Sequence, residues 1–303
     1  MFHHFHGGKH AQGQGSLSAS QFAEMLDWLQ TRYSILDAAD FQSAAINYKL
    51  DASDICISFD DALLCQFDLA LPVLNKYGIK AFFFIYSAPL CGERNYLEIF
   101  RDFRHSSFSE MDEFYEKFFT MVKEEAEDSY YASKIAFKVS DYLAAYPFYS
   151  LNDRWFRYLR DIVLGPKAYQ DTMMRMLERH NYEISTATSR LWMSERQVLS
   201  LHAQGHTIGM HSFSHPTAMS QLTRAEQKKE YFRNKEHLCQ ILGQDHISAM
   251  SHPCGSYNQD TLSILKEMKV EIGFNSSMAN VRGRGPLEIP REDHANILKQ
   301  MAT

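Results

Sequence analysis

The chain has 303 residues, of which 45% are apolar and 22% are charged, as is typical of a soluble globular protein with one large or two smaller domains. A formal net charge of −6 argues against a dedicated nucleic-acid-binding protein, and no apolar run approaches the roughly 18 residues of a membrane span. Five cysteines without a Cys-x-x-Cys spacing exclude a disulfide scaffold, and a first segment without the apolar core of a secretory signal predicts a cytoplasmic location.

The first of three regions, residues 1–90, has the pattern of an α/β fold. Apolar residues recur every three or four positions where we expect helices, and short apolar runs mark buried strands. The expected elements are a first strand at residues 1–6, a helix over 22–33, a strand over 55–59, a helix over 69–77 that ends at Gly78, and a strand over 81–86.

The second region, residues 91–190, is predicted to be a helical insertion. It holds 20 of the chain's 40 aromatic residues, and its apolar residues follow helical spacing. We interpret the aromatic residues as core packing, with a sugar- or lipid-binding cleft as the alternative. An exposed apolar face on these helices is also a candidate interface for a homodimer.

The third region, residues 191–303, resumes the alternation of strands and helices. Capping boxes predict that helices begin after Ser194 and after Thr223, and Gly243 is expected to end the second of them. The remaining expected elements are strands over 206–211, 247–250 and 270–274 and a helix over 259–268. Because strands and helices alternate on both sides of the insertion, the fold class is α/β, with a parallel barrel or an open sheet.

Three polar motifs each follow a predicted buried strand, at the end where α/β folds collect catalytic groups. Asp60 and Asp61 come first. At a strand end, one carboxylate can bind a metal while the other accepts a proton, and the alternative is that the pair caps a helix. His211 and His215 can share a metal, although the same spacing recurs elsewhere among 14 histidines. A turn at Pro253 exposes backbone N–H groups that can stabilise an oxyanion, or it is an ordinary loop. Together, one carboxylate and two imidazoles form an open three-ligand site for a hydrolytic metal.

These motifs make the chain resemble a known family. The sequences Ser-Phe-Asp-Asp at 58–61, His-Ser-Phe-Ser-His at 211–215 and Ser-His-Pro-Cys-Gly at 251–255 resemble the first three motifs of the NodB-homology polysaccharide deacetylases (carbohydrate esterase family 4). The opening Phe2-His3 is similar to the Tyr-His start common in that family. The resemblance implies a divergent member whose fold is a distorted (β/α) barrel of about seven parallel strands, interrupted by a helical insertion. The activity that it implies is hydrolysis of an N- or O-acetyl group on a sugar.

The resemblance covers residues 1–90 and 194–294, and it also implies roles for individual residues. The expected ligands of a divalent metal are Asp61, His211 and His215. Zinc is the expected metal, with cobalt, nickel or manganese as alternatives. The general base is expected to be Asp60, the oxyanion donor the backbone N–H of Cys254, and the substrate contacts His3, Pro253 and Gly255.

Two positions depart from the family's pattern. The third motif of the family begins with an arginine that orients the base, and this chain has Ser251 there. We predict that Arg291 replaces that arginine from another strand end, with a surface salt bridge as the alternative. The late motif that supplies a histidine as general acid has no clean match. His294 is our candidate for the acid, and the alternatives are His3, His4, His6 and His252.

We therefore predict a metal-dependent carbohydrate deacetylase that acts in the cytoplasm. Its expected substrate is a small molecule or an oligosaccharide, an intermediate of a surface polysaccharide such as lipopolysaccharide. A hydrolase of another, non-peptide amide is one alternative, because pocket shape decides between such substrates. A sugar-binding pseudoenzyme is the other, because the family's arginine and acid are not at their usual positions.

Overall fold

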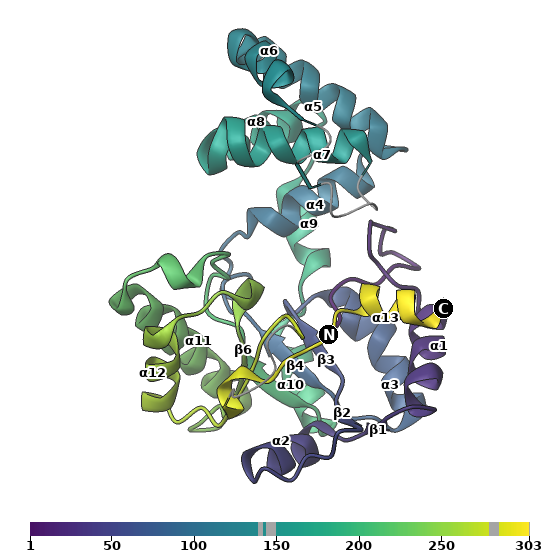
Figure 1. The fold of residues 1–303 in the computed structure, drawn as a ribbon, viewed down its shortest axis with the longest axis vertical. Coiled ribbons are helices and arrows are strands. Elements are labelled where there is room, and N and C mark those ends of the chain that lie inside the picture. The colour runs from purple at the N-terminus through teal and green to yellow at the C-terminus, as the bar shows by residue number, and fades with distance from the viewer. Residues whose placement is uncertain (139–141, 144–149, 279–284, 303) are drawn as a thin grey trace. The chain divides into compact units, whose positions relative to one another are not determined.

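The computed structural model describes residues 1–138, 142–143, 150–278 and 285–302. The chain divides into two compact units (Figure 1). Unit 1 comprises Met1–Asn95 with Ser189–Thr303, and unit 2 comprises Tyr96–Thr188. All the strands named below lie in unit 1.

A five-stranded parallel sheet forms the centre of unit 1, in the order β3-β4-β5-β6-β7 (Figure 1). Its strands are β3 (Ser58–Asp60), β4 (Phe82–Ile85), β5 (Thr207–Met210), β6 (Ala249–Ser251) and β7 (Ile272–Phe274). Every residue of β3, β4, β6 and β7 is buried, as a parallel sheet covered on both faces requires. A separate parallel pair consists of β1 (Ser34–Ile35) and β2 (Asp54–Ile55).

Single-residue bridges extend the five-stranded sheet at both edges. Phe2 pairs in parallel with β3, and Ile289 pairs in parallel with β7. Next to these bridges, the amino group of Met1 donates a hydrogen bond to the Glu292 carbonyl at 2.6 Å. The predicted parallel barrel is therefore confirmed in the form of a curled half-barrel of five strands, and the first expected strand at residues 1–6 is reduced to bridges.

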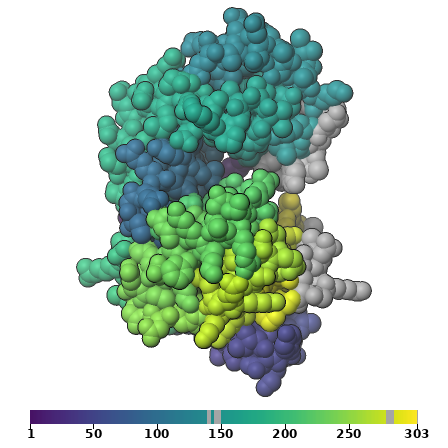
Figure 2. Space-filling view, turned by 90° about the vertical axis from the view of Figure 1, so that its left-hand side faces the viewer, coloured from purple at the N-terminus to yellow at the C-terminus, as the bar shows by residue number. Residues whose placement is uncertain are grey.

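Helices and short turns flank the sheet of unit 1. In Figure 1, α1, α3 and α13 lie on one side of the strands and α11 and α12 on the other, and the side chains of α11 and α12 cover the face of unit 1 shown in Figure 2. The elements are α1 (Ala19–Gln30), α2 (Ala38–Ile46), η1 (Gln66–Ala70), α3 (Leu71–Tyr77), α10 (Glu195–Ala203), η3 (Met219–Gln221), α11 (Arg224–Leu242), η4 (Pro253–Gly255), α12 (Gln259–Glu267), η5 (Pro286–Glu288) and α13 (His294–Met301). A further helix, α9 (Ile184–Leu191), spans the boundary between the units.

Local sequence signals for helix ends are confirmed. Ser194 and Thr223 both form the expected capping boxes at the starts of α10 and α11. Gly78 and Gly243 end α3 and α11 with φ of 68° and 62°, the left-handed conformation that glycine adopts without steric cost. None of the helices in the described ranges is long and apolar enough to cross a membrane.

Two predicted boundaries in the first region are wrong. The apolar run at 55–59 is not one strand, because β2 ends at Ile55 and β3 begins at Ser58. A continuous apolar run does not show where the chain leaves one sheet and enters another. The helix expected to reach Tyr33 ends at Gln30, and Tyr33 is 38% exposed.

Unit 2 consists of helices around an aromatic core. Its elements are α4 (Tyr96–Ser106), α5 (Met111–Glu125), α6 (Glu127–Ala136), α7 (Leu151–Tyr158), η2 (Leu159–Leu164) and α8 (Gly165–Arg179). Phe103, Phe114, Phe118 and Phe156 are fully buried, and Phe156 contacts both Phe114 and Phe118 edge to face. These four rings therefore pack in a core, as their helical spacing predicts.

Gly209 allows β5 to lie close to its neighbours in the sheet. A Cβ atom at this position would lie 2.5 Å from the Phe84 ring and 2.9 Å from the Ala249 carbonyl oxygen. We expect Gly209→Ala to reduce the free energy of unfolding by about 1–3 kcal/mol, because the surrounding core is filled. Gly285→Ala is the control, since nothing lies within 4 Å of its Cβ position and its φ is −86°. Urea unfolding measures both variants, and equal stabilities would contradict this packing.

Candidate metal centre and catalytic site

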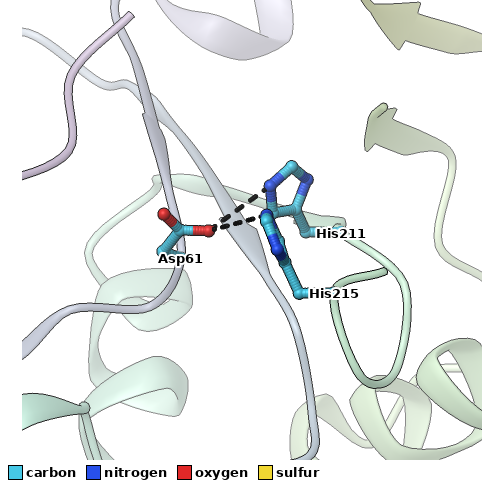
Figure 3. Close-up of side chains that lie close together, drawn as sticks. All are labelled: Asp61, His211 and His215. Atoms are coloured by element: carbon cyan, nitrogen blue, oxygen red, sulfur yellow. Dashed lines mark ion pairs between the residues drawn. The ribbon is translucent and has the colours of Figure 1, made fainter. Parts of the chain in front are cut away.

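Asp61, His211 and His215 converge at the carboxyl end of the sheet, as Figure 3 shows. Asp61 follows β3, and both histidines follow β5. The Nε2 atoms of His211 and His215 lie 3.5 and 3.3 Å from Asp61 Oδ1. The three candidate ligand atoms all lie within 4.8 Å of one another. Two motifs that are far apart in the sequence thus form one cluster.

The chain turns sharply within each of these motifs. The backbone φ angle is 79° at Asp61, 63° at Ser212 and 58° at His215. Non-glycine residues rarely adopt this left-handed region, and those that do cluster at functional sites. Because Asp60 ends the strand and Asp61 already turns, both carboxylates approach His211, whose Nε2 is also 3.9 Å from Asp60 Oδ2.

The donor atoms of the cluster fit a divalent metal. His211 Nδ1 donates to the Ser251 carbonyl at 2.9 Å, so that Nε2 is left with its lone pair on the side of Asp61. Asp61 Oδ1 is buried and accepts no hydrogen bond. Ligand atoms on a tetrahedral zinc ion at bonds of about 2.0–2.2 Å stand roughly 3.3–3.5 Å apart, which matches both measured separations. Burial alone would raise the pKa of Asp61, but the positive charge of the imidazoles when they are protonated, that of His215 first, holds that pKa well below its usual range.

Arg291 is buried and directs all five of its N–H donors to the surroundings of Asp60. Its Nη1 and Nη2 donate to the two carboxylate oxygens at 2.8 and 2.7 Å. The other donations reach Ser58 Oγ at 3.2 Å, Ser251 Oγ at 2.6 Å and the Asn275 carbonyl at 2.8 Å. Burial alone would raise the pKa of Asp60, but the charge of Arg291 above all holds it well below its usual range. At 6% exposure, Arg291 does not form the surface salt bridge that was the alternative.

His3 faces the two carboxylates from the N-terminal segment. Its Nε2 lies 3.8 Å from Asp60 Oδ2 and 4.0 Å from Asp61 Oδ2, and its side chain is 28% exposed. Gln66 links this segment to β3, because its Nε2 donates to the carbonyls of His3 at 2.9 Å and Asp60 at 2.6 Å. Gln66 begins η1, a π-helical turn, and such turns are frequent at functional sites. The role of Gln66 is not predicted from the sequence, because the apolar pattern gives no indication of a polar residue that binds the backbone.

The structure places His294 and His252 in other surroundings. His294 begins α13, its Nε2 is 2.8 Å from the Gly15 carbonyl, and its ring stacks on Phe2. His252 Nε2 is 2.9 Å from the Leu287 carbonyl, and burial lowers the pKa of His252 to about 4. Both imidazoles therefore already bind backbone carbonyls, which favours His3, one of the alternatives, over His294 as the candidate acid.

The third motif forms a tight 3-10 turn beside the cluster. Cys254 has φ of 51°, and its N–H has no acceptor among the described residues. Cys254 is exposed, but desolvation by its surroundings, followed by the charges of Asp61 and Asp60, raises the pKa of its thiol to about 11, so the thiol is mostly protonated at neutral pH. A side chain at Gly255 would be strained, because its φ is 65° and a Cβ would lie 2.2 Å from Ser276 Oγ and force that hydroxyl to move. Pro253 is buried and Cys254 is exposed, so the turn presents Cys254, with its backbone N–H and its thiol.

The part of the chain that contains the second and third motifs is similar to a known protein family. Residues 164–273 match the family model described as polysaccharide deacetylase, and the match includes His211, His215 and Cys254. No curated protein matches the chain.

Several solved structures share the fold. The Streptococcus pyogenes deacetylase PplD, solved in complex with acetate, is similar over 99% of this chain and 96% of its own, with 16% identity and a TM-score of 0.57. IcaB from Ammonifex degensii is similar over 99% of this chain and 93% of its own, with 13% identity and a TM-score of 0.56. A de-N-acetylase from Aggregatibacter actinomycetemcomitans is similar over 99% and 97%, with 13% identity and a TM-score of 0.55. Identities this low establish the fold. Together with the family match over residues 164–273, the shared fold confirms the resemblance to the NodB-homology polysaccharide deacetylases that the motifs indicate.

Proposed function

We propose that the protein is a metal-dependent carbohydrate deacetylase that hydrolyses an N- or O-acetyl group on a sugar. The observation that carries this proposal is the convergence of Asp61, His211 and His215 beside a carboxylate, Asp60, that Arg291 holds ionised. Two imidazoles and one carboxylate with room for a further ligand are typical of hydrolytic metal sites. The neighbouring ionised aspartate is in position to accept a proton.

In this proposal, different residues of the chain bind the metal, accept a proton and orient the base. A divalent metal held by Asp61, His211 and His215 would polarise the acetyl carbonyl and make a water molecule more acidic. Asp60 accepts a proton from the water that attacks the carbonyl carbon. Arg291 keeps both oxygens of Asp60 in place through its bidentate hydrogen bonds.

Breakdown of the tetrahedral intermediate needs one donor to the oxyanion and one to the leaving group. The backbone N–H of Cys254 donates to the oxyanion that forms on the former carbonyl oxygen. His3 donates a proton to the sugar nitrogen or oxygen as its bond to the acetyl carbon breaks, which yields acetate and a free amine or hydroxyl. Burial lowers the pKa of His3, which makes its protonated form a stronger acid, and the proton taken by Asp60 lies within reach to restore it.

The donor set indicates which metals to test. Imidazole nitrogens with one carboxylate oxygen suit zinc, and cobalt and nickel accept the same ligands. Manganese prefers more oxygen ligands and is the weakest candidate of the four. We therefore propose zinc as the resident metal.

The proton donor can be identified by two alanine variants. We expect His3→Ala to lower kcat by about 10²–10⁴-fold, the usual contribution of a general acid, and to leave the metal content unchanged. We expect His294→Ala to keep a kcat near the wild-type value, because its Nε2 binds the Gly15 carbonyl. Initial rates on one acetylated oligosaccharide, with elemental analysis of the same samples, measure both. Loss of turnover in His294→Ala alone would assign the acid to His294 instead.

Release of acetate tests the proposed function directly. The zinc-loaded chain is incubated with N-acetylglucosamine oligomers and with O-acetylated oligosaccharides, and acetate and free amine are quantified. Acetate with an equal amount of new amine supports N-deacetylation, and acetate without amine supports O-deacetylation. Binding of these sugars without acetate release by the metal-loaded chain would favour the pseudoenzyme instead.

We also propose that the helical region is inserted into the barrel. The strands β4 and β5 are neighbours in the sheet, yet all of unit 2 lies between them in the sequence. The cytoplasmic location, the homodimer and the role in surface polysaccharide synthesis stay predictions from the sequence.

A further inference from the structure

We propose that helix α11 positions the metal-ligand loop, residues 211–215, through Glu230 and Asn234. This inference rests on the proposed function, because it assigns the residues that keep His211 and His215 oriented for a shared metal. Both residues bind the backbone of the loop rather than the imidazole nitrogens. They are therefore positioning residues.

The carboxylate of Glu230 accepts three hydrogen bonds from the middle of the loop. Its Oε2 accepts from Phe213 N at 3.1 Å and from Ser214 N at 2.8 Å, and its Oε1 accepts from Ser214 Oγ at 2.9 Å. Hydrogen bonds to an ionised acceptor are stronger than neutral ones. The loop needs such an anchor, because φ is 63° at Ser212 and 58° at His215, a conformation that surrounding contacts must enforce.

Asn234 is fully buried and ties the first ligand of the loop to β4. Its Oδ1 accepts from the backbone N–H of His211 at 3.0 Å. Its Nδ2 donates to the Ile85 carbonyl at 3.0 Å and to Ser87 Oγ at 2.7 Å. Because both N–H groups and the oxygen of this buried amide are bonded, the His211 backbone has a defined place relative to β4.

Arg233 adds a contact to the side chain at the tip of the loop. Its guanidinium carbon lies 3.4 Å from the centroid of the Phe213 ring, and its Nη2 donates to Glu93 at 3.1 Å. Positions 230, 233 and 234 are spaced i, i+3 and i+4, so the three side chains share one face of α11. One helix face thus holds both the backbone and the ring of the loop.

Loss of this anchoring should weaken metal binding without removing a ligand. Residues that orient metal ligands typically contribute about 10–100-fold to metal affinity. We expect Glu230→Ala and Asn234→Ala to raise the Kd for cobalt by about tenfold or more. Glu230→Gln keeps an oxygen that can accept from both amides, and it should restore most of the affinity. Glu236→Ala is the matched control, because Glu236 is an exposed glutamate on the same helix.

Two readouts on the full-length chain test the inference. Cobalt titration, followed by visible absorption, reports the Kd and the geometry of the site. Deuterium exchange of the metal-free chain reports how firmly residues 211–215 are held. For Glu230→Ala we expect a higher Kd and faster exchange in this segment, with exchange within α11 and the thermal midpoint close to those of Glu236→Ala.

The outcomes separate this inference from the proposed function. Wild-type cobalt affinity and wild-type loop exchange in Glu230→Ala would overturn it. Equal weakening in Glu230→Ala and Glu230→Gln would also overturn it, because an acceptor oxygen at this position would then make no difference to the loop. A wild-type chain that binds neither cobalt nor zinc would instead overturn the proposed function, and exchange in the metal-free chain would still decide whether Glu230 holds the loop.

Discussion

Replacing Asp60 with asparagine is expected to lower kcat by about 10²–10³-fold while the chain keeps its metal. Asparagine has nearly the same shape, but its amide does not accept a proton from water at neutral pH. General bases contribute about 10²–10⁴-fold, and Asp60 belongs at the lower end because Arg291 holds its pKa well below its usual range, which makes it a weak base. Steady-state kinetics and elemental analysis of the same sample measure the two quantities.

Asp61→Asn is the matched control for this variant. It is the same chemical change at the adjacent residue, and we expect it to lose the metal together with turnover, since Asp61 Oδ1 faces both imidazoles. A wild-type kcat in Asp60→Asn would show that Asp60 is not the base. Loss of metal from Asp60→Asn, with retention in Asp61→Asn, would exchange the roles of the two carboxylates.

Arg291→Ala is expected to reduce the free energy of unfolding by about 3–5 kcal/mol, because it leaves the buried Asp60 charge without its partner. The pKa of Asp60 should rise in this variant, since burial alone raises it and the opposing charge of Arg291 is gone. A larger fraction of Asp60 is then protonated as the pH falls. The acid limb of the kcat/KM profile should therefore move to higher pH.

An exposed arginine provides the control for Arg291. Arg224 also pairs with two carboxylates, Asp260 and Glu267, but its side chain is 41% exposed. Arg224→Ala should cost at most about 1 kcal/mol, because solvent screens surface ion pairs. Urea unfolding at neutral pH compares the two variants. Similar losses of stability would show that the buried pair with Asp60 does not behave as described.

Local patterns are enough to predict the fold class. The central strands lie in or beside short apolar runs, and capping residues such as Ser194, Thr223 and Gly243 mark the helix ends within a residue or two. Two predicted boundaries are wrong, one in the run that contains β2 and β3 and one at Tyr33. At both places the local sequence fits more than one end point for the element, and tertiary contacts determine which one forms. At the two edges of the sheet, Phe2 and Ile289 form only single-residue bridges. The extent of this pairing also depends on tertiary contacts.

Part of the candidate site could be predicted because parallel strands end on one side of the sheet. That rule indicates that Asp60, Asp61, His211 and His215 lie close together, and the structure brings these four side chains together. The partnership of Arg291 with Asp60 was a hypothesis based on the serine at position 251. The structure pairs the two, although 231 residues separate them in sequence.

The residues that support the site carry no comparable signal in the sequence. Gln66 acts from a π-helical turn, which has no apolar period of its own. Glu230 and Asn234 look like ordinary polar residues of a long, mostly polar helix. Their roles depend on which loop the helix packs against, and only the three-dimensional structure shows that contact.

Metal stoichiometry tests most directly whether Asp61, His211 and His215 form a metal site. The wild-type chain and Asp61→Ala are purified in parallel, incubated with zinc, freed of excess by gel filtration and measured by elemental analysis. We expect about one zinc ion per wild-type chain, from the three-ligand set, and little in the variant. Absence of zinc and of cobalt from the wild-type chain, or equal metal in both chains, would contradict the assignment of Asp61, His211 and His215 as a metal site.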